Sequence, residues 1–317
     1  MSANAYQMVT GKLARGDVVI LDGGTGTDIQ RRGVPMHGET WCAEANVTHP
    51  GVVQAVHEDY IRAGADVITI NTYPTSPLLF EALGRGADVA RIDRSAISIA
   101  KVARAAASKG RPVAIAGSIS VMQPAVAGSD RSATAARTWS RADVRRLYRA
   151  KADTMKEAGV DLIMMEMMRD TTYSVWATEA AMETGLPVWV GIALETKATG
   201  KLTGYARAEE PGEAVIAGLA ALQPAAINIM HTAIGDVDLA LPLLSARTQG
   251  PFGVYPELGY FKMPDWQFAE LSPAEFTAHC ARWRAAGAAI LGGCCGIGPS
   301  HIAALAGSAA HMTVTSH

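Results

Sequence analysis

Residues 157–168 read EAGVDLIMMEMM and contain the end of one predicted helix and the whole of the strand that follows it. Gly159 is typical of a helix C-terminus, where the chain passes through a left-handed conformation. The apolar run after it has the length and near-continuous hydrophobicity of a parallel strand buried on both faces. Two shorter stretches repeat the pattern, RAGADVI at 62–68 and AAGAAIL at 285–291. This partial repeat predicts alternating helices and parallel strands.

Apolar, β-branched runs of this kind occur eight times, and a helical pattern follows each of them. The runs span residues 18–24, 66–73, 112–120, 161–168, 187–194, 225–230, 252–258 and 288–295. Eight alternations of strand and helix predict an α/β protein with the architecture of a (β/α)8 TIM barrel. We expect a single domain over residues 1–317, because no linker or low-complexity tract divides the chain. The small-residue stretch at 125–136 is predicted to be a mobile loop with the length of a lid.

An open, doubly wound sheet is the alternative architecture, and it would require a glycine-rich phosphate loop after the first strand. The segment DGGTGT at 22–27 follows that strand and is rich in glycine. Its spacing matches neither G-x-G-x-x-G nor the G-K-[ST] ending of a Walker motif. We therefore interpret the segment as a tight turn at the mouth of a barrel.

The composition of the chain argues against several classes of protein. It has 317 residues, 49% of them hydrophobic and 18% charged, and a formal net charge of -2. Nearly balanced charge without a basic run argues against a nucleic-acid surface, and no apolar stretch approaches the ~18 residues of a membrane span. The N-terminus lacks the basic and apolar regions of a secretory signal, and the cysteines are too few for a disulfide scaffold. We expect a cytoplasmic protein with small-molecule partners and no nucleic-acid or membrane partner, whose apolar residues permit a homodimer.

Polar and thiol side chains stand at the carboxyl ends of the predicted strands. In a TIM barrel the reactive groups come from these ends, which meet at one rim. Each group alone is also compatible with a polar side chain satisfied in a turn. Together they predict one site, formed by Asp22, Asn71, Tyr73, Ser118, Glu166, Asn228, His231, Tyr255, Glu257, Cys294 and Cys295.

Residues 292–296 read GGCCG and are the most specific part of this rim. Neighbouring side chains of a regular strand point to opposite faces, so two adjacent cysteines cannot meet one ion in that geometry. Glycines on both sides allow the backbone to leave strand geometry and turn both sulfurs inward. The alternative is that both are small buried hydrophobic residues, as free cysteines often are. We expect Cys280 to belong to the core and Cys42 to be structural.

Several of these motifs, in this order and over almost the whole chain, resemble the homocysteine S-methyltransferase family. They are LDGGTGTDIQRRG at 21–33, WCAEANVTHPGVVQAVHEDYIRAGADVITINTYPTS at 41–76, the Glu166 strand, VYPELG at 254–259 and ILGGCCGIGPSHI at 290–302. Length and spacing are most similar to the small branch that uses S-methylmethionine. The resemblance implies a (β/α)8 barrel that holds Zn²⁺ through three cysteines. It also implies methyl transfer from a small sulfonium donor to the thiol of homocysteine, which gives methionine.

The resemblance also implies roles for individual residues. Cys294 and Cys295 match two of the zinc ligands, while Asp22 and Glu166 match the acids that hold the ammonium group of the amino acid. The implied substrate-binding set is Asp22, Gly23, Gly24, Asn71, Ser118, Glu166, Asn228 and Tyr255. The residue chemistry is consistent with this assignment, because Zn²⁺ deprotonates a coordinated thiol and buried carboxylates need a cationic partner.

One position departs from the family pattern. The first zinc-binding cysteine of the family lies in a G-[IV]-N-C segment, and Ile229 stands at the place of that cysteine here. Isoleucine cannot bind a metal, but His231 follows two residues later, and imidazole is a good zinc ligand. We hypothesise a site formed by Cys294, Cys295 and His231. The alternative is that His231 is a loop histidine and that zinc is bound weakly or not at all.

The exchange of a thiolate for a neutral imidazole changes the charge of the proposed centre. Zinc with three thiolates carries a net charge of about -1, and with two thiolates and a neutral histidine about 0. A substrate thiolate at the less anionic centre should be bound more tightly and be less nucleophilic. This predicts a slower enzyme or one matched to a more reactive donor, such as a sulfonium.

The donor side of the site is less specific in sequence. A sulfonium or quaternary ammonium group binds over aromatic faces, and the aromatic residues predicted near the rim are Tyr73, Tyr255, Tyr260, Phe261 and Trp266. Glu257 and Leu258 replace small polar residues of the family, and Glu257 would either attract a cationic donor or face water. Two other functions stay open: methyl transfer to another thiol or selenol, and a metal-free barrel that binds a thiol or amino acid or uses the cysteine pair in redox chemistry.

Overall fold

The computed structural model describes residues 5–124, 138–196 and 200–312. The loop predicted at 125–136 lies outside the described residues. The main sheet has eight strands in the order β1-β13-β10-β9-β5-β4-β3-β2, and all its paired strands are parallel. A parallel bridge between Leu21 and Val67 joins β1 to β2 and closes the sheet into a barrel. The strands are β1 (Val19–Ile20), β2 (Val67–Thr69), β3 (Ala114–Ser120), β4 (Leu162–Met168), β5 (Val188–Ile192), β9 (Ala226–Ala233), β10 (Phe252–Glu257) and β13 (Ile290–Leu291).

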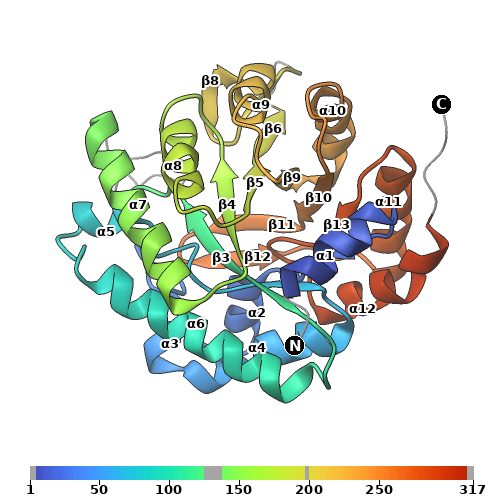
Figure 1. Ribbon diagram of the computed structural model, residues 1–317, viewed down its shortest axis with the longest axis horizontal. Coiled ribbons are helices and arrows are strands. Elements are labelled where there is room, and N and C mark those ends of the chain that lie inside the picture. The colour runs from blue at the N-terminus through green and yellow to red at the C-terminus, as the bar shows by residue number, and fades with distance from the viewer. Residues whose placement is uncertain (1–4, 125–137, 197–199, 313–317) are drawn as a thin grey trace.

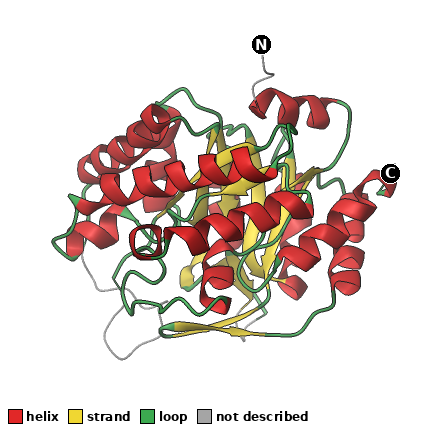
Figure 2. Cartoon of the chain, turned by 90° about the horizontal axis from the view of Figure 1, so that it is seen from below, coloured by secondary structure: helices red, strands yellow, loops and turns green. Residues whose placement is uncertain are grey.

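The eight predicted strands correspond one for one to these eight, so the predicted (β/α)8 barrel is confirmed. Helices surround the strands, as Figures 1 and 2 show. They are α1 (Ala5–Ala14), α2 (Thr25–Arg31), α3 (Ala45–Thr48), α4 (Pro50–Ala63), α5 (Pro77–Ala82), α6 (Asp88–Ala107), α7 (Arg141–Ala158), α8 (Tyr173–Met182), α9 (Gly212–Ala220), α10 (Ile234–Ser245), α11 (Pro273–Ala285), α12 (Pro299–Ser308) and the short 3-10 helix η1 (Ala309–His311).

The three glycines of the sequence repeat end helices as predicted. Gly64 after α4 and Gly159 after α7 have positive φ values of 106° and 79°. Gly287, which follows α11 after one further residue, has a φ of 101°. A residue with a side chain would be strained in this conformation, whereas glycine adopts it readily. Each glycine thus turns the chain from a helix directly into the next barrel strand.

The hydrophobic core has two layers, one inside the barrel and one between the barrel and its helices. Consecutive strand residues alternate between the layers: Val19, Leu21 and Met164 point inward, whereas Ile20 and Ile163 face the helices. This alternation follows from the pleat of a β-strand. Helix α1 covers the amino-terminal end of the barrel, where its Val9 joins the inner layer and Tyr6 accepts a hydrogen bond from the Trp189 indole. The opposite, carboxyl end is therefore the accessible one.

Two antiparallel insertions follow barrel strands at this carboxyl end. The first is a three-stranded sheet of β6 (Leu194–Thr196), β7 (Leu202–Gly204) and β8 (Arg207–Pro211), which comes directly after β5. The second is the hairpin of β11 (Gly259–Lys262) and β12 (Asp265–Phe268), which comes after β10 (Figure 1). Both insertions contribute walls to the cavity described below.

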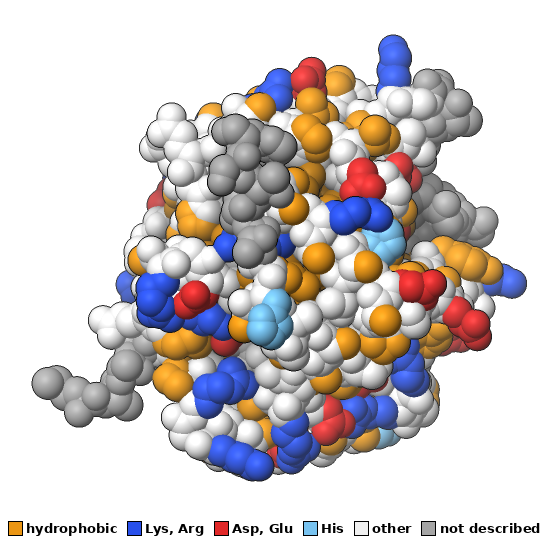
Figure 3. Space-filling model, turned by 90° about the vertical axis from the view of Figure 1, so that its right-hand side faces the viewer, with side chains coloured by type: hydrophobic (Ala, Val, Ile, Leu, Met, Phe, Trp, Pro, Cys, Tyr) orange, Lys and Arg blue, Asp and Glu red, His pale blue; other side chains and the backbone are white. Residues whose placement is uncertain are grey.

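The outer surface carries charges of both signs. On the face drawn in Figure 3, acidic and basic side chains are interspersed, as the small net charge leads one to expect. Among the described residues, no helix has both the length and the apolar character that crossing a lipid bilayer requires.

Candidate active site

A cavity of about 360 Å³ opens at the carboxyl ends of the barrel strands. The segment from Asp22 to Gly24 lines it as the turn between β1 and α2, as expected for the mouth of a barrel. Of the residues predicted from strand ends, those that line the cavity are Asp22, Gly23, Gly24, Asn71, Tyr73, Glu166, His231, Tyr255, Cys294 and Cys295. The five aromatic residues predicted near the rim also line it: Tyr73, Tyr255, Tyr260, Phe261 and Trp266.

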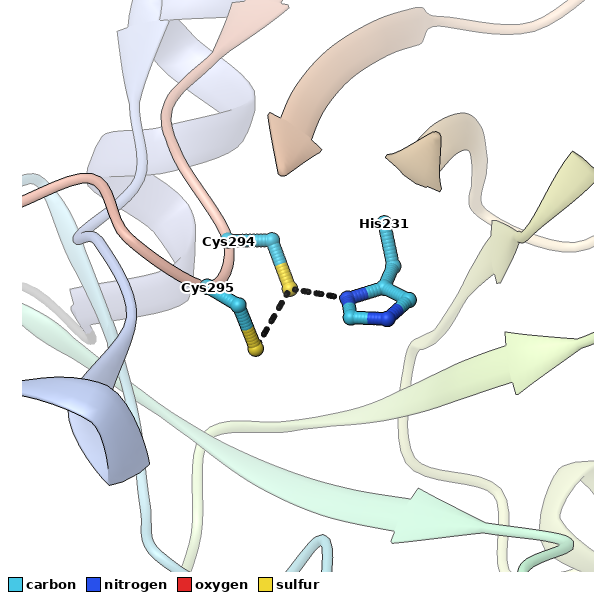
Figure 4. Close-up of side chains that lie close together, drawn as sticks. All are labelled: His231, Cys294 and Cys295. Carbon is cyan, nitrogen blue, oxygen red and sulfur yellow. Dashed lines mark hydrogen bonds between the residues drawn. The ribbon is translucent and has the colours of Figure 1, made fainter. Parts of the chain in front are cut away.

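Cys294 and Cys295 lie just after β13, and their sulfur atoms are on the same side of the chain. The two Sγ atoms are 4.0 Å apart, and Cys294 Sγ is 3.4 Å from Nδ1 of His231 (Figure 4). The flanking glycines make this compact turn possible, because a Cβ at Gly293 would overlap the Ile297 side chain. Gly296 also has a φ of 83°, which a residue with a side chain rarely adopts. The backbone therefore leaves strand geometry where the sequence predicts it.

His231 reaches the cavity because strand β9 departs from regular alternation. Ile227 and Ile229 pack in the outer layer, between the barrel and the helices, and Met230 packs in the inner layer. Regular alternation would point residue 231 outward as well. His231 has a φ of +42°, and this left-handed conformation turns its imidazole into the cavity. Ile229, at the place of the family cysteine, instead faces the helices.

Glu257 forms an ion pair with His231, which the sequence did not reveal. Its Oε2 lies 2.9 Å from Nε2 of His231, and only 9% of Glu257 is exposed. Of the two alternatives for Glu257, that it faces water is wrong: the register of β10 shifts between Tyr255 and Glu257, and the carboxylate is buried beside β9. Burial alone would lower the pKa of His231, but Glu257 and Cys294 raise it to about 10. The Glu257 carboxylate thus favours the protonated form of the imidazole.

Asp22 and Glu166 are two buried carboxylates in the same cavity. Asp22 accepts a hydrogen bond of 2.6 Å from the backbone N–H of Thr69, and Glu166 accepts one from the Ser118 hydroxyl. Burial raises the pKa of Glu166 to about 7 and that of Asp22 well above its usual range, and Glu166 contributes to the shift of Asp22. An unpaired carboxylate pair of this kind favours binding of a cation.

The backbone of β4 presents Glu166 to the cavity through a bulge. The pairing of β4 with β5 shifts register between Met165 and Met168, and Met167 has a φ of +57°. Glu166 and Met167 consequently both line the cavity, although they are neighbours in sequence. Bulges of this type redirect side chains next to active sites.

The remaining predicted residues lie around the cavity in different roles. Ser118 does not line it but donates to Glu166. Asn228 is buried below the cavity, where Nδ2 donates to the Val190 carbonyl at 3.4 Å and Oδ1 makes no hydrogen bond among the described residues. Tyr255 lines the cavity, and its hydroxyl is buried without a hydrogen-bond partner among the described residues.

Cys42 and Cys280 are both buried and lie away from the sulfur pair. Asn71 donates to the Cys42 carbonyl at 3.0 Å and accepts from the Cys42 thiol at 3.1 Å, so both residues fix the loop after β2. Cys280 belongs to the outer core layer. The structural roles expected for these two cysteines are confirmed.

Comparison with known proteins identifies the family. The family model described as homocysteine S-methyltransferase matches residues 19–309. The chain belongs to the homocysteine S-methyltransferase family. It is accordingly a methyltransferase, and its predicted resemblance to this family is confirmed.

Two curated relatives and one solved structure show how far the similarity extends. The chain is 28% identical over 308 residues to a homocysteine S-methyltransferase of Escherichia coli. The aligned region covers 92% of this chain and 96% of the relative. It is 30% identical over 318 residues to betaine–homocysteine S-methyltransferase 1 of Xenopus tropicalis, and the aligned region covers 93% of this chain and 73% of the relative. The metallated crystal structure of the E. coli homocysteine methyltransferase MmuM superimposes with a TM-score of 0.75 at 24% identity and covers 94% of this chain and 99% of that one.

Three cavity residues with ionisable side chains were not anticipated from the sequence: Arg169, Glu195 and Tyr205. Arg169 follows β4 directly, so its place after the Glu166 run was the signal that could have found it. Glu195 lies in β6 and Tyr205 lies between β7 and β8. No motif marks these two positions, because the antiparallel insertion that brings them to the cavity has no counterpart in the strand repeat.

Proposed function

We propose that this protein transfers a methyl group from a small sulfonium donor, S-methylmethionine being the first candidate, to homocysteine, with Zn²⁺ bound by Cys294, Cys295 and His231. The observation that supports this most is the arrangement of three metal-binding side chains beside two unpaired carboxylates in one cavity. A thiol and an ammonium group on one small amino acid match these two halves of the site.

The three side chains fit a zinc ion. Their ligand atoms all lie within 4.8 Å of one another. Tetrahedral zinc with bonds of about 2.3 Å to sulfur and 2.0 Å to nitrogen separates two sulfurs by about 3.8 Å, and sulfur from nitrogen by about 3.5 Å. The corresponding distances from Cys294 are 4.0 Å to Cys295 and 3.4 Å to His231. Two thiolates and one imidazole are also a ligand set of catalytic zinc sites that leave the fourth position to a substrate.

Glu257 supports His231 as a ligand in this proposal. Nδ1 of His231 faces Cys294, and Nε2 faces the Glu257 carboxylate. A carboxylate behind a metal-binding histidine fixes the tautomer and the ring orientation. The Glu257 carboxylate also adds one negative charge beside the site, where the exchange of a thiolate for imidazole has removed one. The less anionic centre expected from the ligand set alone is therefore compensated by Glu257.

Bound zinc would supply deprotonation of the acceptor thiol. Asp22 and Glu166 would bind the ammonium group of the acceptor and place its sulfur beside the two cysteines. In the reaction, the acceptor sulfur forms a bond to the methyl carbon while the bond from that carbon to the donor sulfur breaks. The bonding electron pair stays on the donor sulfur, which leaves as a neutral thioether. This protein would accelerate the step mainly by aligning the two substrates.

The donor would lie on the aromatic side of the cavity. Tyr205 and Trp266 flank His231, with ring centroids 5.0 Å and 5.6 Å from the imidazole. Aromatic faces attract a sulfonium cation through their quadrupole. They also exclude water, which would otherwise solvate the charged sulfur atoms of the two substrates.

A donor panel tests the proposal. Zinc-loaded protein is incubated with homocysteine and, separately, with S-methylmethionine, S-adenosylmethionine, dimethylsulfoniopropionate or betaine, and methionine is measured. We expect methionine from S-methylmethionine, and we expect zinc content and turnover to fall together in His231→Ala. Absence of methionine with every donor would contradict the proposed activity, and full zinc content and full turnover in His231→Ala would remove that residue from the metal site.

A second candidate function is methyl transfer to another thiol or to a selenol. The observation that favours it is the loss of the family cysteine at Ile229, since a changed metal centre suits an acceptor of different nucleophilicity. The same assay with selenocysteine, cysteine and homocysteine as competing acceptors distinguishes the two. A higher kcat/KM for homocysteine supports the first candidate.

A further inference from the structure

Arg169 is a buried cation that has no ion pair with any carboxylate of the described residues. It is only 6% exposed and lines the cavity just after β4. Its guanidinium makes one hydrogen bond among the described residues, from Nη1 to the Tyr205 carbonyl at 3.4 Å, and none of their carboxylates forms an ion pair with it. Buried arginines are almost always paired, because removing the charge from water is costly.

The described charges near Arg169 compensate it only in part, because none of them forms an ion pair with it. The Asp170 carboxylate is engaged at the start of α8, where it accepts from the backbone N–H groups of Thr172 and Ser174 and from the Ser174 hydroxyl. Arg207 adds a second positive charge nearby. Burial and the charge of Arg207 lower the pKa of Arg169 against the opposing effect of Asp170 and two tyrosines, yet a guanidinium stays protonated in proteins. The cavity therefore contains a positive charge that an anionic ligand group would complete.

The position of Arg169 separates it from the acceptor's end of the cavity. The guanidinium of Arg169 reaches the first antiparallel insertion, where it donates to the Tyr205 carbonyl, whereas Asp22 and Glu166 are hydrogen-bonded to Thr69 of β2 and Ser118 of β3. The carboxylate of an amino acid is attached to the same carbon as its ammonium group. An acceptor held at Asp22 and Glu166 would thus keep its own carboxylate close to that pair.

Tyr205 connects Arg169 to the proposed metal ligands. Its carbonyl accepts from Arg169, and its ring packs 5.0 Å from the ring of His231. One residue therefore spans the distance between the guanidinium and the ligand cluster. A ligand that contacts both Arg169 and the ligand cluster would therefore pass along Tyr205.

We propose that Arg169 forms an anionic subsite that binds the carboxylate of the methyl donor, so that the donor is a small onium compound with a carboxylate at the far end of its chain. This inference rests on the proposed function, and it narrows the donor class. Arginine binds a carboxylate through two parallel N–H groups, which fixes direction as well as position. With its carboxylate held at Arg169, the donor's onium group would lie over Tyr205 and present its methyl group to the acceptor sulfur.

Paired donors and paired variants test the subsite. The donors are S-methylmethionine and (3-aminopropyl)dimethylsulfonium, which keeps the sulfonium and the amine but lacks the carboxylate. The variants are Arg169→Met, Arg169→Lys and, as a control, Arg207→Met, which removes a nearby positive charge that does not line the cavity. We measure KM for each donor and for homocysteine. The equilibrium affinity of each donor is measured separately by calorimetry, which does not require turnover.

We expect Arg169→Met to raise KM and the dissociation constant for S-methylmethionine by roughly 10- to 100-fold, the value of a lost hydrogen bond between charged groups. Arg169→Lys should retain part of the affinity, and Arg207→Met should retain it all. KM for homocysteine and the already weak binding of the donor without a carboxylate should stay unchanged. An increase in homocysteine KM instead, or equal losses for both donors, would overturn the subsite. Absence of turnover in the wild type would contradict the proposed function. The donor affinities measured by calorimetry would still show whether Arg169 binds the donor carboxylate.

Discussion

Lys151 and Arg169 are both buried cations, but their surroundings differ. Lys151 on α7 lies outside the barrel and is fully buried; its Nζ donates to Asp93 at 2.7 Å and to the hydroxyl and carbonyl of Thr75 at 2.8 and 3.1 Å. Arg169 lines the cavity, and its one hydrogen bond among the described residues goes to a carbonyl. Burial makes either charge costly, so each needs a partner.

The comparison separates structural from functional polar groups in this protein. Around Lys151, the chain itself supplies every partner. In the cavity, several charged groups have hydrogen bonds but no oppositely charged partner: among the described residues, Asp22, Glu166 and Arg169 form no ion pair. Substitutions in the first region should therefore change stability, and those in the second should change binding. Four predictions test this distinction.

The largest effect is expected for Cys294→Ala. Loss of a direct metal ligand should reduce zinc affinity and turnover by more than the roughly 10- to 100-fold expected for residues behind the ligands. The unfolding free energy of the metal-free protein should change little, because the thiol lies in the cavity. Competition with a chelator measures the zinc affinity, and urea unfolding measures the unfolding free energy. Cys280→Ala, in the core, is the control: it should lower the unfolding free energy and leave the zinc affinity unchanged. Wild-type zinc affinity in Cys294→Ala would contradict the proposed ligand set.

Lys151→Met should destabilise the fold by about 3–5 kcal/mol, because Asp93 is left as an uncompensated buried charge. Arg169→Met removes a cation that has no ion pair, so we expect its unfolding free energy to stay within about 1 kcal/mol of the wild type or to rise. Urea unfolding of both variants measures the contrast. Equal destabilisation would break the distinction between the two regions.

Glu257→Gln is expected to weaken zinc binding by roughly 10- to 100-fold while the metal-binding atoms remain in place. The amide keeps the shape of the side chain but removes the charge facing His231. Chelator competition measures the affinity, and the absorption spectrum of the Co²⁺-substituted protein reports whether the ligand set persists. Glu209→Gln, on the exposed face of β8, is the matched control. Unchanged zinc affinity in Glu257→Gln would show that Glu257 does not support the metal site.

The smallest effect is expected for Ser118→Ala, seen in the pH dependence of the acceptor's kcat/KM. The pKa of Glu166 is about 7, and the Ser118 hydrogen bond lowers it against the effect of burial. Since the ionised carboxylate binds the ammonium group, kcat/KM should fall as the pH drops through this value. Without the serine hydroxyl the pKa rises, so the acid limb should move upward by about one pH unit. A shift to lower pH, or none, would contradict this assignment.

The folded pKa of Glu166 also has a consequence for stability. It lies above the usual value of 4.5, so the carboxyl binds protons more tightly in the folded state. Its contribution to stability is therefore fully present below about pH 4.5 and is lost as the pH rises through about 7. Bound acceptor ammonium would offset this loss at neutral pH.

Local sequence patterns predicted much of the fold and part of the site. Strand runs and helix-ending glycines such as Gly64 and Gly159 depend on a few consecutive residues, so they are visible in one segment at a time. Asp22 and Glu166 could be placed in the cavity because carboxyl ends of barrel strands meet at one rim. Ser118 and Asn228 stand at similar ends, but strand pairing and bulges decide whether such a side chain lines the cavity or lies behind it.

The sequence by itself determined the barrel, its order of strands and helices, and the pair of adjacent cysteines at the rim, because these follow from periodicity and from backbone preferences of single residues. Only the tertiary structure decided that His231 turns inward, that Glu257 pairs with it across 26 positions, and that no carboxylate in the described part of the chain pairs with Arg169. Such contacts join residues far apart in the chain. Their energy depends on burial and distance, and neither quantity exists before the strands have come together.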